Sequence, residues 1–381
     1  MRDISILGST GSIGVQALEV IAANPNQFRV VALAAGGSNI PRLVEQARAF
    51  GVKVVAVEGD GALLREALPG VNVIDGNGAA AQVAAIPVDV MLNAITGSVG
   101  LGPTLNALGV GNKVALANKE SLVAGGDLVL RAAKPGQIIP VDSEHSALAQ
   151  ALRAGTKDEV SNLILTASGG PFRNRNDLSD VTIEEALAHP TWNMGPVVTI
   201  NSATLVNKGL EIIEAHYLFD IPYSKIEAVI HPQSIIHSMV EFHDGSVIAQ
   251  ASPPSMKLPI ALALSWPDRT VGVIPPIDWN TSHTWSFNPI DNAKFPAIEL
   301  ARRCGEIGGA MPAIFNAANE EAVAAFLKGQ IKFTEIIEIV DAVLQQLAGN
   351  APATLSDIAD VSAVEEDARV SANQNIQMRG K

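Results

Sequence analysis

Apolar residues in the first part of the chain gather in short runs, and amphipathic stretches separate these runs. The runs predict buried strands over residues 3–7, 28–34, 52–57, 71–74, 88–93, 113–117 and 137–141. The stretches between them have helical periodicity, and this alternation is typical of a sheet with helices on both faces. We therefore expect an α/β domain built on a doubly wound, mostly parallel sheet.

The pattern becomes less regular after a helix that reaches about Arg153. Extended segments are predicted over residues 162–167, 197–200, 226–230, 235–242 and 247–251, the last two joined as a hairpin. A short helix is predicted from Thr182, because Thr182 and Glu185 have the spacing of a capping box. Further helices are predicted over about 201–217 and over 256–266. This mixture predicts an α+β domain.

The last part of the chain contains a linker and then helices. Residues 267–296 are rich in proline and lack periodicity, which is typical of a segment laid over a surface. Four helical patterns follow over 297–306, 313–327, 333–347 and 355–369 and predict a small bundle. We therefore divide the chain into segments 1–148, 149–266, 267–296 and 297–381.

Composition narrows the possible partners and surroundings. The formal net charge of −13 argues against nucleic acid or an anionic membrane as a partner, because no broad basic surface is available. Cys304 is the single cysteine, so neither a disulfide framework nor a thiolate metal site can form. The start of the chain lacks the pattern of a signal peptide, and no apolar run has membrane-spanning length. We expect a cytoplasmic protein.

A glycine-rich stretch, Gly8-Ser9-Thr10-Gly11-Ser12-Ile13-Gly14, follows the first predicted strand and precedes a helix. Strand, glycine turn and helix form the unit that binds dinucleotides, with backbone N–H groups at the helix start holding a pyrophosphate. The spacing G-x-x-G-x-x-G differs from the usual one. A tight turn in an ordinary α/β domain is therefore the alternative interpretation.

The second predicted strand ends in Gly36-Gly37-Ser38-Asn39. Enzymes that use NAD often have an acidic residue here for the ribose 2′-hydroxyl. None is present, so a 2′-phosphate would meet no repulsion, and Ser38 and Asn39 are able to hydrogen-bond it. Arg42 lies one turn further along. The preference for NADP is argued mainly from the missing negative charge, because no basic residue stands at position 37 or 38.

Polar side chains follow three later strands, in the stretches 93–97, 118–120 and 142–144. The carboxyl ends of parallel strands share one edge of a sheet, so these stretches are expected near the cofactor. Asp142 and Glu144 supply oxygen ligands for a hard divalent cation. Their alternative role is to cap the helix that follows.

Glu211 is a candidate for a third metal ligand. On its predicted helix Asn207 and Glu211 share a face, Lys208 lies beside them, and together with Ser202 they form a candidate anion-binding set. Three carboxylates would leave positions on Mg²⁺ or Mn²⁺ for substrate oxygens. An exposed helical glutamate without a ligand is the alternative for Glu211.

These motifs together resemble the 1-deoxy-D-xylulose 5-phosphate reductoisomerase family. The matching blocks run in order over nearly the whole chain, at residues 8–14, 116–122, 140–145, 168–172, 189–195, 202–211, 231–234 and 316–320. The resemblance implies an N-terminal Rossmann-like domain that binds NADPH (1–148). It also implies an α+β catalytic domain (149–266) with a mobile loop at about 168–196 and dimerisation strands, a linker (267–296) and a C-terminal helical domain (297–381).

The resemblance also implies the activity and the residues that perform it. The enzyme would rearrange 1-deoxy-D-xylulose 5-phosphate with Mn²⁺ or Mg²⁺ and reduce the product with NADPH to 2-C-methyl-D-erythritol 4-phosphate, for isoprenoid synthesis. Asp142, Glu144 and Glu211 would hold the metal. The substrate-binding residues would be Ser168, Ser202, Asn207 and Lys208 on the phosphate, Ser143 and Lys119 on the carbon backbone, and His189 and Trp192 on the mobile loop.

The implied cofactor residues lie in several blocks. Thr10, Gly11, Ser12 and Ile13 would meet the pyrophosphate. The stretch Gly36, Gly37, Ser38 and Asn39 would lie near the 2′-phosphate. Around the ribose and nicotinamide the resemblance places Asn118, Lys119, Glu120, Met194, Gly195 and Met256. A homodimer is the expected assembly.

Two other classes of protein remain as alternatives at this point. An NADP-dependent semialdehyde dehydrogenase of the acylating type needs a nucleophilic cysteine beside the nicotinamide, and Cys304 lies far along in the helical tail. A nucleotide-sensing protein would have little use for metal carboxylates, a phosphate set and a lid together. His231 and the other histidines outside the lid are expected to have structural roles.

Overall fold

The computed structural model describes residues 1–192 and 194–379, so Asn193, Gly380 and Lys381 lie outside the described residues. The chain divides into two compact units. The first comprises Met1–Ser121, Val129–Ser146 and Ser255–Pro275, and the second comprises Leu122–Leu128, Ala147–Pro254 and Pro276–Lys381.

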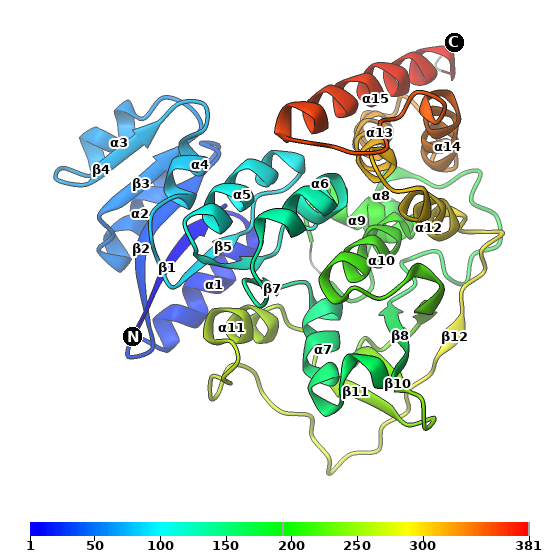
Figure 1. Cartoon of the computed structure of the whole chain (residues 1–381), viewed down its shortest axis with the longest axis horizontal. Coiled ribbons are helices and arrows are strands. Elements are labelled where there is room, and N and C mark those ends of the chain that lie inside the picture. Colours follow the sequence, from blue (N-terminus) through cyan, green and yellow to red (C-terminus); the bar gives the residue numbers. More distant parts are fainter. Residues whose placement is uncertain (193, 380–381) are drawn as a thin grey trace. The chain divides into compact units, whose positions relative to one another are not determined.

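The first unit is built on a seven-stranded sheet (Figure 1). Its strands lie in the spatial order β4 (Asn72–Asp75), β3 (Val54–Val57), β2 (Phe28–Ala35), β1 (Arg2–Leu7), β5 (Val90–Asn93), β6 (Lys113–Leu116) and β7 (Ile138–Pro140). Every neighbouring pair is parallel. The chain moves outward from β1 to β4 and then continues on the other side of β1, so the strand order reverses between β1 and β5. The prediction of a doubly wound parallel sheet is confirmed.

Helices follow the strands of this sheet as the alternating pattern predicted. They are α1 (Ser12–Ala23), α2 (Ile40–Phe50), α3 (Ala62–Ala67), α4 (Ala79–Ala84), α5 (Leu101–Gly109) and α6 (Glu120–Ala132). Alternate residues of a strand point to opposite faces. Ile4 and Ile6 therefore share one face, where they join a buried core with Leu18 of α1 and Leu43 of α2.

Helix α11 (Lys257–Ser265) belongs to the first unit, whereas the predicted boundaries place it in the segment 149–266. Seven of its nine residues are buried, and Ile260 and Leu264 lie in the same core as Ile4 and Ile6. An almost wholly apolar helix of this kind needs partners on several sides. The packing of α11 against α1, β6 and β7 supplies them, which explains why the segment joins this unit despite its place in the sequence.

The second unit contains a five-stranded mixed sheet. The strands lie in the order β11 (Val247–Ala251), β10 (Ile236–Phe242), β8 (Val160–Ala167), β9 (Ile226–Ile230) and β12 (Asn288–Pro289). β8 and β9 are parallel, and the other pairs are antiparallel. β10 and β11 form the hairpin that the sequence predicted around Asp244-Gly245.

The prediction of an extended segment over residues 197–200 is wrong, because α9 (Pro196–Ala203) is a helix. Val-Val-Thr-Ile has the β-branched composition of a strand, but Pro196 stands at the start of the helix, where proline is favourable. α9 packs against α8 (Ile183–Leu187) and α10 (Val206–Phe219), and this tertiary packing outweighs a weak local preference. Leu205 has φ +61° and separates α9 from α10, so the helix predicted over about 201–217 comprises the end of α9 and the whole of α10.

The C-terminal part of the second unit is the predicted helical bundle, drawn from yellow to red in Figure 1. Its members are α12 (Ala297–Ile307), α13 (Met311–Leu327), α14 (Glu335–Leu347) and α15 (Ile358–Arg379). α13 packs against both α14 and α15. α7 (Ser143–Ala151) begins in the first unit and ends in the second. Among the described residues, no helix combines the length and the apolar character needed to cross a membrane.

Candidate active site

The glycine-rich loop between β1 and α1 has the close packing that a dinucleotide loop requires. A Cβ atom on Gly14 would lie 2.4 Å from the carbonyl oxygen of Gly8 and 2.5 Å from the Cα of Ser9. Gly8 has φ +76°, and a Cβ there would lie 2.4 Å from the carbonyl oxygen of Ala94, which follows β5. Only glycine fits at either position. The loop therefore lies between β1 and β5, where the strand order reverses and α/β sheets bind their ligands.

Helix α1 starts directly after this loop. Gly11 precedes it without a side-chain cap, and Gly11 and Ser12 are exposed. The first N–H groups of a helix lack partners within the helix and attract anions. The geometry suits the pyrophosphate position predicted for Thr10, Gly11, Ser12 and Ile13. Gln46 of α2, which sequence reasoning missed, is buried and donates to the carbonyl of Ser9 at 2.9 Å, so it fixes the loop from the side.

At the end of β2, Gly37 has φ +93° and Asn39 caps α2, accepting the N–H of Arg42 at 3.1 Å on its Oδ1 atom. The amide nitrogen of Asn39 is therefore the part that can donate to a 2′-phosphate. The carboxylate of Glu58, at the end of the neighbouring strand β3, accepts the N–H groups of Gly78 and Ala80. The carboxylate of Glu58 is thus hydrogen-bonded to the backbone at the start of α4.

Asn118 has a more internal position than the predicted cofactor contact implied. It is completely buried, and its Nδ2 donates to the carbonyls of Ile95 (2.9 Å) and Gly97 (2.8 Å) and to Glu120 (2.8 Å). A Cβ on Gly100 would lie 2.4 Å from its Oδ1. The side chain of Asn118 therefore joins the loops after β5 and β6 and shapes this edge of the sheet.

Lys119 and Asp142 form an ion pair at the carboxyl edge of the sheet, after β6 and β7. The ammonium nitrogen lies 2.6 Å from Oδ2, and both side chains are about nine-tenths buried. Burial opposes ionisation of Asp142, but the positive charge of Lys119 and its hydrogen bond to the carboxylate outweigh it, so the pKa of Asp142 lies well below its usual range. The carboxylate is ionised, as a metal ligand must be.

Asp142 directly precedes α7, and its backbone carbonyl accepts the N–H of Ser146 at 2.8 Å, which is the first hydrogen bond of the helix. Its carboxylate, however, is paired with Lys119. Ser143 is buried and donates to the carboxylate of Glu144. Met256, the remaining predicted cofactor residue of this unit, packs against the core of the sheet.

In the second unit, α10 brings together three predicted residues as their spacing indicated. Asn207 and Lys208 both donate to the carboxylate of Glu211, one to each oxygen. The side chains of Lys208 and Glu211 are 4% and 1% exposed, so this is a buried ion pair and not the exposed glutamate of the alternative interpretation. Gly209 allows α12 to approach, because a Cβ there would lie 2.7 Å from the Cβ of Ala301.

The loop after β8 lies against α9, so two predicted phosphate residues are neighbours. Gly169 and Gly170 have φ +81° and +64°, and a Cβ on Gly170 would lie 2.9 Å from the carbonyl oxygen of Ser202. Glycine at 170 therefore allows the loop that carries Ser168 to touch the residue that carries the second hydroxyl. Asn319 of α13 donates to Oδ1 of Asn201 at 2.9 Å and holds α9 in place, a role that sequence reasoning missed.

Two residues of the predicted mobile loop also lie in this region. His189 Nε2 is 3.0 Å from Oγ of Ser168, and Trp192 packs edge-on against His237 with ring centres 6.2 Å apart. His237 is bonded to the carbonyl of Ser252 at 3.1 Å, and burial lowers its pKa to about 4. Asn193 of this loop lies outside the described residues, and Met194 and Gly195 immediately precede α9.

His231 has the structural role that the sequence predicted. Its Nε2 accepts the N–H groups of Ile235 and Ile236, both at 3.1 Å, and its Nδ1 is bonded to the carbonyl of Ser286 at 3.0 Å. Gln233 also exchanges hydrogen bonds with Ser286. The His-Pro-Gln-Ser turn thus fastens the linker.

The semialdehyde dehydrogenase alternative lacks its nucleophile. Cys304 is buried on α12, and burial raises the pKa of its thiol to about 12. A thiol of this kind is protonated at neutral pH and inert as a nucleophile.

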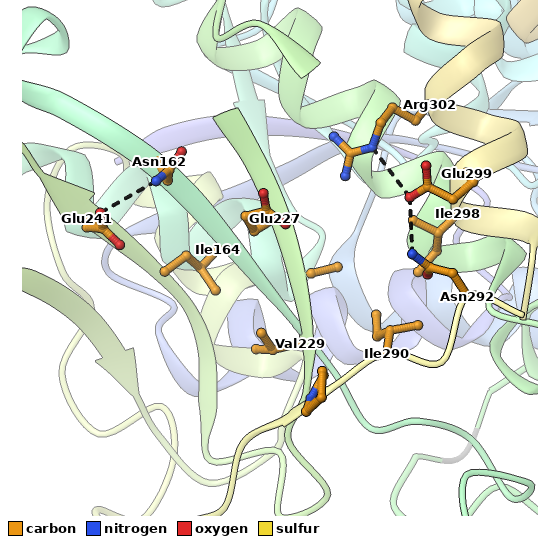
Figure 2. A pocket seen from close by; sticks show the side chains of 12 residues that line it. Asn162, Ile164, Glu227, Val229, Glu241, Ile290, Asn292, Ile298, Glu299 and Arg302 are labelled. Carbon is orange, nitrogen blue, oxygen red and sulfur yellow. Dashed lines mark hydrogen bonds and ion pairs between the residues drawn. The ribbon is translucent and has the colours of Figure 1, made fainter. Parts of the chain in front are cut away.

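A cleft of about 390 Å³ lies on the sheet of the second unit (Figure 2). Asn162 and Ile164 of β8, Glu227 and Val229 of β9 and Arg302 of α12 line part of it. None of its twelve lining residues is a predicted site residue.

Comparisons with known proteins show which family the chain is similar to. Sequence models of three parts of one family match residues 4–126 (1-deoxy-D-xylulose 5-phosphate reductoisomerase), 138–219 (its C-terminal domain) and 251–370 (DXP reductoisomerase C-terminal domain). The chain is 59% identical to the 1-deoxy-D-xylulose 5-phosphate reductoisomerase of Mycobacterium marinum, over 94% of this chain and 89% of that protein. It is 57% identical to that of Corynebacterium efficiens, over 98% and 97%.

Solved structures of the same name are also similar. The reductoisomerase from Zymomonas mobilis in complex with NADPH has a TM-score of 0.91 and 41% identity, with 99% of both chains covered. A DOX-P reductoisomerase in complex with NADPH, fosmidomycin and magnesium has a TM-score of 0.93 and 36% identity, again with 99% of both chains covered. The chain therefore belongs to the 1-deoxy-D-xylulose 5-phosphate reductoisomerase family.

Proposed function

We propose that the chain converts 1-deoxy-D-xylulose 5-phosphate into 2-C-methyl-D-erythritol 4-phosphate with NADPH and a divalent metal ion, as a step of isoprenoid precursor synthesis. This proposal rests on the residues found at the carboxyl edge of the parallel sheet in the first unit. This edge holds a loop with two positions that only glycine can occupy, and it also holds the ionised, largely buried carboxylate of Asp142 beside Lys119. Cofactor and reacting sugar would thus meet at one edge.

We propose that Asp142, Glu144 and Glu211 hold the metal. The donor set fits a hard cation, because all three groups are carboxylates, and such oxygens suit Mg²⁺ and Mn²⁺. When bound, the ion supplies a Lewis acid for the ketone and neighbouring hydroxyl oxygens of the sugar. Lys119, held by Asp142, brings an ammonium group to the same place, where it can donate to substrate oxygens or move a proton. Ser143 would orient the carbon backbone.

The phosphate would be held in the second unit. Ser168 offers a hydroxyl from the loop after β8 and Ser202 offers one from the end of α9. Asn207 and Lys208 offer amide and ammonium donors from α10. Binding energy from a phosphate remote from the reacting carbons can be used to orient them. The loop with His189 and Trp192, covering about 168–196, would close over the sugar and exclude water.

For the cofactor, we propose that the glycine loop holds the pyrophosphate and that Ser38 and Asn39 face the 2′-phosphate. Glu120, Met194, Gly195 and Met256 would lie around the ribose and nicotinamide. Asn118 would act by shaping the loops after β5 and β6, because its side chain is committed to them. When bound there, NADPH would supply the hydride that reduces the aldehyde formed by the rearrangement.

The direct test is to follow NADPH absorbance when protein, Mn²⁺ and 1-deoxy-D-xylulose 5-phosphate are mixed. We expect steady loss of absorbance that stops on addition of EDTA and resumes with excess Mn²⁺. A well-folded protein that binds NADPH and leaves its absorbance constant would refute the proposed function and would favour a nucleotide sensor.

We also propose that the chain forms a homodimer and works in the cytoplasm. β11 is an edge strand with Val247 and Ile248 exposed by 46% and 38%, and such an edge is a template for pairing with a second copy. Light scattering should give twice the mass of one chain, 39.8 kDa. A single buried cysteine suits a reducing compartment.

A further inference from the structure

The imidazole of His189 has hydrogen bonds on both nitrogens. Its Nδ1 accepts the backbone N–H groups of Thr191 at 3.1 Å and of Trp192 at 2.8 Å. A ring nitrogen that accepts hydrogen bonds presents its lone pair and carries no proton. The neutral ring must then carry its proton on Nε2, which lies 3.0 Å from Oγ of Ser168. His189 therefore donates to Ser168, and the tautomer is set by the backbone of the turn.

This bond determines what the hydroxyl of Ser168 can do. Its oxygen accepts the N–H of Gly170 at 3.3 Å as well as Nε2–H of His189. A hydroxyl has two acceptor positions and one donor, so both acceptor positions are filled. The remaining role is to donate. The terminal oxygens of a phosphate dianion are acceptors, so a serine held in this state is suited to bind one.

We propose that His189 is a positioning residue, whose neutral Nε2–H tautomer fixes Ser168 as a hydrogen-bond donor to the substrate phosphate and holds the Thr191–Trp192 turn beside it. The inference rests on the proposed function, because it takes Ser168 as a phosphate ligand. It assigns to His189 an indirect role, in addition to any contact with the substrate.

The surroundings of His189 favour the neutral ring. Burial lowers its pKa, and the guanidinium of Arg173, in the loop after β8, lowers it further. Trp192 of this turn packs on His237, whose own pKa is lowered to about 4 by burial. A proton on Nδ1 would replace an acceptor by a donor facing two N–H groups. Acidification through the pKa of His189 should therefore release the turn.

The tautomer can be observed without any turnover. We would label the full chain with ¹⁵N-histidine and record the shifts of the ring nitrogens near neutral pH, assigning His189 by the signals missing from His189→Asn. We expect Nδ1 to have the shift of a lone-pair nitrogen and Nε2 that of an N–H. The opposite tautomer, or an imidazolium, would overturn the proposal. Absent turnover in the wild type would instead refute the proposed function and leave the tautomer result intact.

Two substitutions separate the two nitrogens. His189→Asn keeps an acceptor oxygen near the position of Nδ1 and removes the donor to Ser168. His189→Gln keeps an N–H donor near the position of Nε2 and removes the acceptor for the turn. We expect His189→Asn to raise KM for the phosphorylated substrate about tenfold or more, as loss of a hydrogen bond to a charged group does, and His189→Gln to raise it less. The reverse order would contradict the proposal.

A double-mutant cycle tests the connection to Ser168. If His189 acts through this hydroxyl, Ser168→Ala and His189→Asn should each raise KM, and the double variant should be no worse than Ser168→Ala alone. Effects that multiply would show that His189 acts independently of Ser168. Melting temperatures of the four proteins establish whether each is folded. If one variant does not fold, the ¹⁵N-histidine spectrum of the wild type still determines the tautomer of His189.

Discussion

The ammonium nitrogen of Lys119 lies 2.6 Å from Oδ2 of Asp142, and the two residues follow neighbouring parallel strands, β6 and β7. They are 23 positions apart in the sequence, yet the shared strand direction brings both side chains to one edge of the sheet. The pair joins a candidate metal ligand to a candidate proton donor.

Asp142→Asn keeps the size of the side chain and removes its charge. We expect Mn²⁺ affinity to fall at least about tenfold, because even partners of metal ligands change affinity by this amount. Titration calorimetry with Mn²⁺ measures it. Asp367→Asn makes the same change at an exposed position of α15 and should leave the affinity unchanged. Equal affinities of wild type and Asp142→Asn would exclude Asp142 as a ligand.

Glu211→Gln tests the ligand proposed from the second unit. We expect turnover to fall by about a thousandfold, since metal catalysis supplies several kcal/mol, while NADPH still binds because its loop lies in the first unit. Stopped assays give the rate, and quenching of protein fluorescence gives NADPH binding. Glu66→Gln on α3 is the matched control. Near-normal turnover of Glu211→Gln would show that the assignment is wrong.

Gly14→Ala places a methyl group 2.4 Å from the carbonyl oxygen of Gly8. The loop must shift, so we expect a loss of about 1–3 kcal/mol in the free energy of unfolding, together with weaker NADPH binding. Chemical denaturation and cofactor titration measure the two effects. Gly59→Ala, where a Cβ meets nothing within 4 Å, is the control and should be close to neutral.

Arg42 is exposed in the first turn of α2, where side chains lean toward the start of the helix and hence toward residues 36–39. We expect Arg42→Ala to weaken NADPH binding about tenfold and to leave NADH binding almost unchanged, because only NADPH carries the 2′-phosphate. Lys53→Ala removes an exposed charge from the same unit and serves as control. An equal loss for both cofactors would place Arg42 away from the phosphate.

His237 should make stability depend on pH. Its folded pKa, about 4, lies below the ordinary 6.5, so the unfolded chain binds more protons between these values. The stabilising contribution is fully present above about pH 6.5 and is lost as the pH falls toward 4, amounting to roughly 3 kcal/mol. Denaturation midpoints at a series of pH values measure it. His237→Gln retains an N–H donor for Ser252 and should flatten the dependence in this window.

The sequence by itself determined the parallel sheet, the hairpin and the helical bundle, because periodicity and glycine positions are local properties of the chain. It also indicated the residues of α10 that meet, since a spacing of four residues places two side chains on one helix face. The family motifs identified Asp142, Glu144 and Ser168 as candidates before their surroundings were visible.

Tertiary structure decided features that depend on partners distant in the sequence. Val-Val-Thr-Ile became helix α9 because α8 and α10 pack against it, and α11 joined the first unit because the core there could bury its apolar surface. Asn118 acquired a loop-bridging role from the carbonyls of Ile95 and Gly97. The tautomer of His189 follows only from which N–H groups face its ring. Such roles arise from three-dimensional neighbours, and no local pattern encodes them.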